Sequence, residues 1–96
     1  MITEVAILNI KQDQSEAFLK SFTVAEKIIS SSKGYISHEL QKCIEENDKF
    51  LFTVKWQTLE DHTEGFRESE QYQEWKKLLH HFYDPFPIVE HYKKIL

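Results

Sequence analysis

The sequence predicts an α+β fold whose elements follow the order β-α-β-β-α-β. Two segments place apolar residues three or four positions apart, which is the spacing of one helical face. Four shorter segments are rich in β-branched and aromatic residues, as strands are. A chain of 96 residues has room for one hydrophobic core, so residues 1–96 are expected to form a single domain.

The first strand and the first helix are expected in the N-terminal third of the chain. Residues 2–10 are rich in β-branched side chains and alternate loosely. Asp13 is expected to open the helix, with Glu16 as its capping-box partner three residues later. Gly34 is placed to end this segment in a left-handed conformation. One helical face carries four apolar residues: Phe18, Phe22, Ala25 and Ile29.

The middle of the chain predicts a β-hairpin. A strand over residues 35–44 would put Ile36, His38 and Leu40 on one face, with His38 either against the first helix or on the sheet surface. Residues 45–49 form a polar connection of hairpin length. The next strand, residues 50–56, alternates cleanly, and one of its faces carries Phe50, Phe52, Val54 and Trp56.

The last third predicts two helical segments and a final strand. Thr58 caps a short helix, with Asp61 three residues on, and Ser69 caps a longer one. The longer helix should end before residues 84–87, because the prolines there cannot continue the hydrogen-bond ladder. Residues 88–95 then form the fourth strand. The apolar face of the longer helix contains Tyr72, Trp75, Leu79 and Phe82.

This order corresponds to the ferredoxin-like arrangement, a four-stranded antiparallel sheet with both helices on one side. The other side of the sheet has no cover within the chain. A second copy of the same sheet is the simplest cover, so we expect a homodimer in which two sheets close into an α+β barrel.

Composition excludes several classes of protein. The net charge is −4 and the 12 basic residues are scattered, so no nucleic acid partner is expected. No apolar run approaches the ~20 residues needed to cross a membrane, and no secretory signal follows Met1. The single cysteine, Cys43, cannot form an internal disulfide, which fits a reducing cytoplasm.

Aromatic and imidazole side chains are concentrated between residues 56 and 92. Both tryptophans and four of the five histidines lie there. This mixture is typical of a pocket for a flat organic molecule, and it is also compatible with an aromatic core. If there is a pocket, the candidate residues for binding a small aromatic ligand are Trp56, Phe66, Tyr72 and Trp75.

The histidines are the candidate catalytic groups. His62, at a helix start, could act as a general base or pack its helix. His80 and His81 are neighbours that point about 100° apart on a helix, so at most one faces inward. Strand alternation groups His91 with Val89, in a solvated position or at the dimer seam. No histidine or cysteine spacing indicates a metal site, and no glycine-rich phosphate loop is present.

Nearly the whole chain resembles the antibiotic biosynthesis monooxygenase family. The resemblance rests on residues 50–56 and 58–62, followed by Phe66, Ser69, Tyr72, Trp75 and Leu79, and extends over nearly the whole chain. It implies a dimeric α+β barrel. The family's characterised oxygenases use molecular oxygen on electron-rich polycyclic substrates without metal or prosthetic group. By this resemblance no cofactor is expected, and His62, His80 or His81 would be the base.

A related branch of that family degrades haem with an asparagine, a tryptophan and a haem-ligating histidine. The resemblance places Ala6, Phe66 and Lys76 at those three positions, so haem degradation is not expected. Two functions stay open. One is cofactor-independent monooxygenation of a small aromatic or polycyclic compound. The other is non-catalytic binding of a small molecule or haem in the same barrel.

Overall fold

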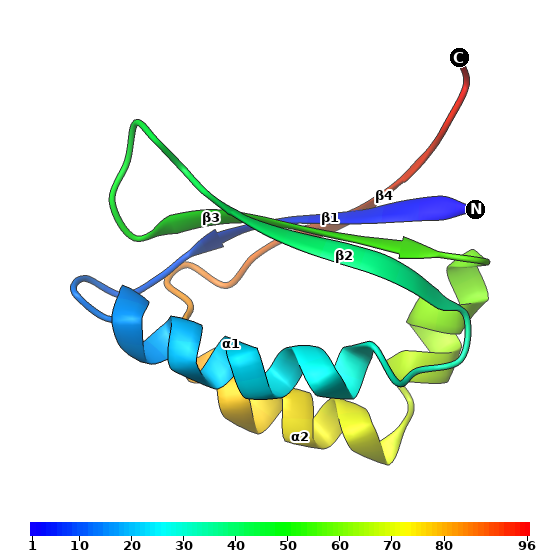
Figure 1. Cartoon of the computed structure of the whole chain (residues 1–96), viewed down its shortest axis with the longest axis horizontal. Coiled ribbons are helices and arrows are strands. Elements are labelled where there is room, and N and C mark those ends of the chain that lie inside the picture. The colour runs from blue at the N-terminus through cyan, green and yellow to red at the C-terminus, as the bar shows by residue number, and fades with distance from the viewer.

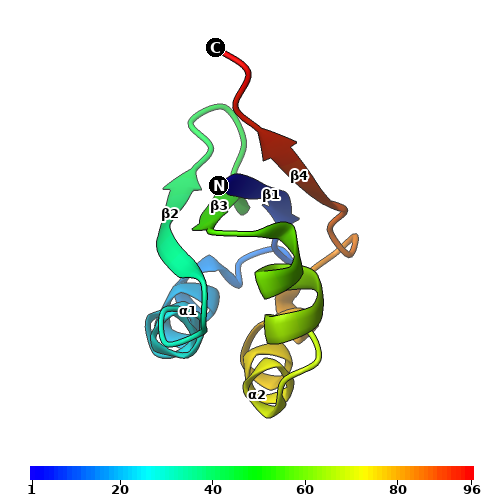
Figure 2. The same ribbon diagram turned by 90° about the vertical axis from the view of Figure 1, so that its right-hand side faces the viewer.

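The computed structural model describes residues 1–96 and has the predicted order of elements (Figure 1). The sheet has the strand order β2-β3-β1-β4, and all neighbouring strands are antiparallel. Both helices lie on the same side of this sheet (Figure 2), which confirms the ferredoxin-like fold. The elements are β1 (Ile2–Asn9), α1 (Ser15–Ile29), β2 (Tyr35–Lys42), β3 (Lys49–Trp56), the π-helix η1 (Asp61–Phe66), α2 (Glu70–Leu79), the 3-10 helix η2 (His80–Phe82) and β4 (Val89–Lys93).

The hydrophobic core lies between the sheet and the two helices. The alternating face of β3 and the predicted apolar face of α1 are both fully buried there. From the second helical segment, Trp75, Leu79 and Phe82 join them. Burial of this apolar surface holds the helices on the sheet. The buried residues of β3 and α1 are Phe50, Phe52, Val54 and Trp56, and Phe18, Phe22, Ala25 and Ile29.

The start of α1 differs from the prediction. Asp13 has a φ of 63° and lies outside the helix, which begins at Ser15 without a side-chain cap from Gln14. Asp48, in the connection between β2 and β3, accepts hydrogen bonds from Ser15 Oγ and from the Asp13 N–H instead. The capping box of Asp13 and Glu16 is therefore wrong, because an acid distant in sequence fixes this turn. Gly34, with a φ of 83°, has the predicted left-handed conformation, but it does not end the helix, because α1 already ends at Ile29.

A register shift in β2 changes which residues face the helices. The pairing with β3 is irregular between Tyr35 and Ser37, so Tyr35 joins His38 on the helix side. Ile36 is 43% exposed, and its prediction on the face of His38 is wrong for this reason. His38 itself lies against α1, 2.8 Å from Glu26.

The capping residues of the second half are as predicted. The Asp61 N–H donates to Thr58 Oγ1 at 3.1 Å, and the Tyr72 N–H donates to Ser69 Oγ at 3.2 Å. No helix in the structure is both long and apolar enough to cross a lipid bilayer.

The last strand is shorter than predicted and pairs with β1. Glu4 is opposite His91, and Ala6 is opposite Val89. Partners on adjacent strands point to the same face of a sheet. Because Glu4 and Ala6 are buried under the helices, Val89 and His91 also lie on the helix side, and the expected place of His91 at a dimer seam is wrong.

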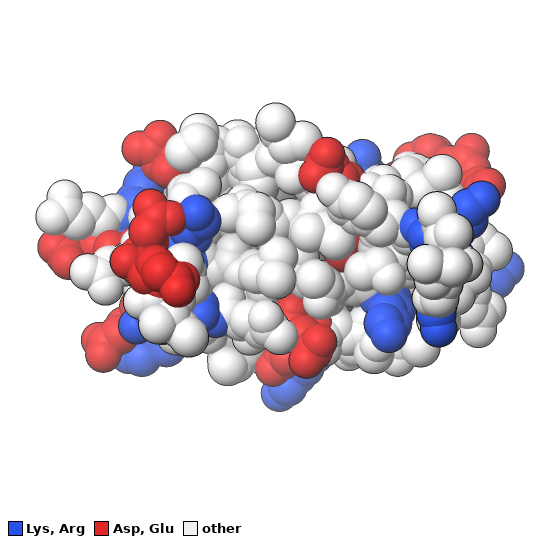
Figure 3. All heavy atoms as spheres, turned by 90° about the horizontal axis from the view of Figure 1, so that it is seen from above, with Lys and Arg blue, Asp and Glu red and all other residues white.

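The opposite face of the sheet is exposed and carries few charges at its centre. Figure 3 shows uncharged side chains in the middle of this face, with acidic and basic side chains around them. Ile7 of β1 points outward there and is 43% exposed.

Candidate functional site

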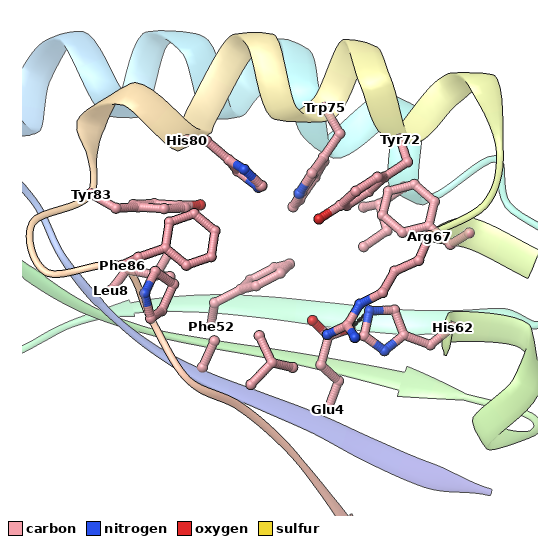
Figure 4. Close-up of a pocket in the computed structure, with 15 residues that line it drawn as sticks. Glu4, Leu8, Phe52, His62, Arg67, Tyr72, Trp75, His80, Tyr83 and Phe86 are labelled. Carbon is pink, nitrogen blue, oxygen red and sulfur yellow. Dashed lines mark ion pairs between the residues drawn. The ribbon is translucent and has the colours of Figure 1, made fainter. Parts of the chain in front are cut away.

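A cavity of about 450 Å³ lies between the helix side of the sheet, α2 and the segment that leads to β4 (Figure 4). Its volume is within the usual range for sites that bind small organic molecules. Ten of the fifteen residues around it are hydrophobic, so the wall is mainly apolar and aromatic. Its apolar wall includes Leu8, Phe52, Phe66, Trp75, Phe86 and Val89.

Glu4 is a buried carboxyl group on the wall of this cavity. Strand alternation in β1 puts it on the apolar face with Ala6 and Leu8, and it is 6% exposed. Its Oε1 accepts a hydrogen bond from Trp56 Nε1 at 3.0 Å and lies 3.3 Å from His62 Nε2. Oε2 has no hydrogen-bond partner. Since every buried side-chain oxygen and nitrogen has one, Oε2 is accessible, on a residue that lines the cavity.

Burial gives this carboxyl an unusual proton affinity. Loss of water around Glu4 raises its pKa from 4.5 to about 7, although the hydrogen bond from Trp56 and the charge of Arg67 oppose the rise. Both protonation states are therefore populated near neutral pH. A group of this kind can accept a proton from a ligand and return it, which is what general acid–base catalysis requires.

His62 is the immediate neighbour of this carboxyl, and it is buried. The residue is 3% exposed, and its ring stacks on Trp56 with the ring centroids 5.3 Å apart. Burial, helped by the positive charge of Arg67 and by His91, lowers the pKa of His62 to about 3. A histidine with this pKa is neutral at pH 7 and a weak base. His62 thus lies in the core beside Trp56, at the helix start where the sequence placed it.

His91 completes a row of three polar side chains from three elements. Its Nε2 is 2.8 Å from His62 Nδ1, and burial together with Arg67 lowers its pKa. We call these residues the Glu4–His62–His91 row. Sequence reasoning did not single out Glu4, although a charged residue on the apolar face of a strand was the available signal.

The far end of the cavity has its own polar groups. His80 lies edge-on to Phe86, with ring centroids 4.9 Å apart, and next to Tyr83 (Figure 4). Burial raises the pKa of Tyr83, as do Tyr72 and Glu4, so its hydroxyl stays protonated and can donate a hydrogen bond. Burial and the charge of Lys76 lower the pKa of His80. An elongated ligand would thus meet hydrogen-bonding groups at both ends.

The structure brings most of the predicted site residues together. His62, His80, Phe66, Tyr72 and Trp75 all line the cavity.

Two of the predicted residues do not reach the cavity. Trp56 lies behind His62 and contacts Glu4, and His81 is exposed. The prediction that only one of His80 and His81 faces inward is confirmed, since His80 alone lines the cavity.

Of the three residues at the positions that haem-degrading proteins use, two line the cavity and one does not. Ala6 and Phe66 line the cavity, whereas Lys76 is exposed on α2 with its amine 5.9 Å from the Tyr72 ring. No three His, Cys, Asp or Glu side chains are grouped so that they could hold a metal ion. Within the row, Glu4 and His91 contact opposite nitrogens of His62, so the three do not converge on one point.

Comparisons with known proteins agree with this architecture. The model of the family described as antibiotic biosynthesis monooxygenase matches residues 1–78. The uncharacterized protein YczJ of Bacillus subtilis (strain 168) is 56% identical over 95 residues, which cover 99% of this chain and all of that protein.

Two solved structures illustrate the shared fold. The crystal structure of a proposed antibiotic biosynthesis monooxygenase from Bordetella bronchiseptica is 27% identical, with a TM-score of 0.93 over 99% of this chain and 97% of that one. SnoaB, a cofactor-independent oxygenase from Streptomyces nogalater, is 9% identical, with a TM-score of 0.85 over 99% of this chain and 93% of its own. At that identity the likeness to SnoaB shows the fold alone.

Proposed function

The chain belongs to the antibiotic biosynthesis monooxygenase family, and from this premise we propose that it is a cofactor-independent monooxygenase of a small aromatic or polycyclic compound. One observation carries the proposal. Glu4 presents a free carboxylate oxygen to an aromatic-walled cavity, and its pKa of about 7 suits proton transfer at neutral pH.

The proposed chemistry begins with removal of a proton from the bound ligand by Glu4 Oε2. The base is thus Glu4 rather than His62, because the lowered pKa of His62 makes it a poor proton acceptor. The resulting carbanion reacts with molecular oxygen. For an anthrone, the CH₂ carbon loses two hydrogens and becomes a carbonyl, and the second oxygen atom leaves as water. The substrate supplies all the electrons, so no added reductant is required.

Other cavity residues have supporting roles in this proposal. Arg67 is the only lysine or arginine around the cavity, and its guanidinium would stabilise the anion as it forms. Phe66 and Trp75 provide flat apolar surfaces for the ring system, and Tyr72 adds a hydroxyl. The apolar wall would also keep water from returning the proton to the carbanion.

Oxygen uptake with an anthrone tests the function directly. The purified protein should consume oxygen and form the corresponding anthraquinone without added metal or flavin. Anthrone binding without oxygen consumption would contradict the monooxygenase and support a protein that only holds its ligand. An absorption band on addition of haem would instead support the haem-binding alternative.

We also propose that the active form is a homodimer joined through the exposed sheet face. The uncharged centre of that face supports this, as does the exposure of Ile7 within it (Figure 3). Ile7→Lys should produce monomers in sedimentation at micromolar concentration. Val24→Lys is the matched control, since Val24 is 53% exposed on α1, away from the sheet face. A monomeric wild-type protein would contradict the proposal.

A further inference from the structure

The Glu4–His62–His91 row has two open ends. At one end, Glu4 Oε2 is accessible from the cavity. At the other end, His91 is half-buried and only its Nε2 has a protein partner. Because no buried side-chain nitrogen in the structure lacks a partner, His91 Nδ1 contacts solvent. The central residue, His62, contacts its two neighbours through different ring nitrogens, so the row is continuous from cavity to surface.

We propose that this row conducts protons between Glu4 in the cavity and solvent at β4, with His91 as its outer residue. The proposal rests on the proposed function in one respect, namely that Glu4 receives a proton from the ligand. A ligand that fills the cavity separates Glu4 from the water at the cavity mouth. The carboxyl must nevertheless release its proton before it can accept another, and the two imidazoles provide a route that the ligand does not block.

The transfer conserves protons and involves no electrons. After the carboxyl group of Glu4 rotates so that its protonated oxygen faces His62, that proton passes to His62 Nε2. At the same time the proton on His62 Nδ1 passes to His91 Nε2, and the proton on His91 Nδ1 passes to water. Both imidazoles end neutral, and one proton has left the carboxyl. The 2.8 Å step between the histidines is within hydrogen-bond reach. The 3.3 Å step from Glu4 is longer, as catalytic contacts commonly are before a ligand binds.

The charge around the row favours passage of one proton at a time. Arg67 follows η1 and lowers the pKa of Glu4, His62 and His91 alike. A second proton on the row would therefore be repelled. Besides the members of the row and Arg67, Tyr83 interacts with Glu4, and its raised pKa keeps its hydroxyl protonated and uncharged.

Imidazole proton exchange in the ligand-free protein tests the proposal without any substrate. In protein labelled with ¹⁵N-histidine, nuclear magnetic resonance measures how fast the His62 N–H exchanges with water. His91→Gln keeps an amide oxygen that can accept a hydrogen bond from His62, but it cannot pass a proton on. It should slow the exchange by roughly a hundredfold, the lower end of what a positioned proton-transfer group contributes. His81→Gln, the same change at an exposed histidine, should leave the rate unchanged.

A second variant protects the test against a change in folding. His91→Ala should also slow the exchange, and imidazole added to the solution should restore it by occupying the vacated space. An unchanged rate in His91→Gln would overturn the relay and leave His91 as a positioning residue. Failure of imidazole to restore exchange in a folded His91→Ala would overturn it equally. Neither outcome depends on anthrone oxidation, so the relay and the proposed function can fail separately.

Discussion

Two histidines in this protein are held in similar ways at two places under the sheet. His38 places Nε2 2.8 Å from Glu26 and Nδ1 2.5 Å from the Tyr35 hydroxyl. We call this group the Glu26–His38–Tyr35 bridge. In the Glu4–His62–His91 row, the central imidazole also has a carboxyl group at Nε2 and an aromatic partner at Nδ1.

The two groups differ in their contact with water. The Glu26 side chain is 40% exposed, whereas that of Glu4 is 7% exposed. The cavity borders the row, and none of the bridge residues lines it. The bridge therefore ties α1 to β2, while burial in the row raises the proton affinity of its carboxyl. The degree of burial thus decides whether similar residue types connect two elements of the fold or form a candidate acid–base group.

The largest expected difference between the two groups is in turnover. Glu4→Gln should lower the rate of anthrone oxidation by roughly a hundredfold to ten-thousandfold, because the amide cannot accept the proton. Glu26→Gln makes the same change in the bridge and should leave the rate unaltered. Steady-state oxygen uptake by the two variants provides the measurement. Equal losses would show that the row has no special role in the chemistry.

The second difference is in folding stability. His62→Ala should cost about 4 kcal/mol of unfolding free energy, because it leaves a hole beside Trp56 and removes a neighbour of the buried Glu4. His38→Ala should cost about 1 kcal/mol, since water can replace its contacts with the half-exposed Glu26. Urea denaturation compares the two variants. A smaller loss at His62 than at His38 would contradict the difference in burial.

The fold could be predicted from the sequence because periodicity records which side of each element is buried. The clean alternation of β3 and the spacing of apolar residues in α1 specify the core directly. The bulge at Tyr35 and the cap from Asp48 escaped prediction, because each depends on a partner that folding brings close. Local patterns contain no information about such partners.

The site was predictable only in part for a related reason. The aromatic lining, and the fact that no more than one of His80 and His81 faces inward, follow from composition and helical geometry. The pairing of Glu4 with His91 depends on the register of β4 against β1, which no spacing in the sequence reveals. The burial of His62 depends on stacking against Trp56 at the end of β3. Glu4 emerges as the proposed base only when these three separate elements are seen together.

The pH dependence of stability should also separate the row from the bridge. Folding raises the pKa of Glu4, so the folded protein binds this proton more tightly than the unfolded chain. The resulting stabilisation is complete below pH 4.5 and is lost as the pH rises through about 7. Each tenfold change in proton affinity between the unfolded and folded chain corresponds to about 1.4 kcal/mol, so the loss is about 3 kcal/mol. Glu4→Gln abolishes this titration, so its stability relative to wild type should rise between about pH 4 and pH 8.

The lowered pKa of His62 makes a stability contribution with the opposite pH dependence. Because wild type and Glu4→Gln share this contribution, it cancels when the stabilities of the two proteins are compared. The contribution of His62 is present above pH 6.5 and is lost as the pH falls through about 3, in wild type and variant alike. The difference between the two proteins therefore reports Glu4. Thermal or urea unfolding at several pH values measures it, with Glu26→Gln as the control. A difference that does not change with pH would show that Glu4 is ionised normally in the fold.

The smallest expected effect is that of Tyr35→Phe, and it tests whether the two groups are independent. The variant loses only the hydroxyl that contacts His38, at a partly exposed site, so stability should fall by about 1 kcal/mol or less. Yet the Tyr35 ring also packs edge-on against Trp56, with ring centroids 6.3 Å apart, and Trp56 donates a hydrogen bond to Glu4. Because phenylalanine preserves that ring contact, anthrone oxidation should stay at the wild-type rate. If turnover falls while stability is nearly unchanged, the hydroxyl of the bridge influences Glu4 through Trp56, and the row and the bridge would have to be treated as one network.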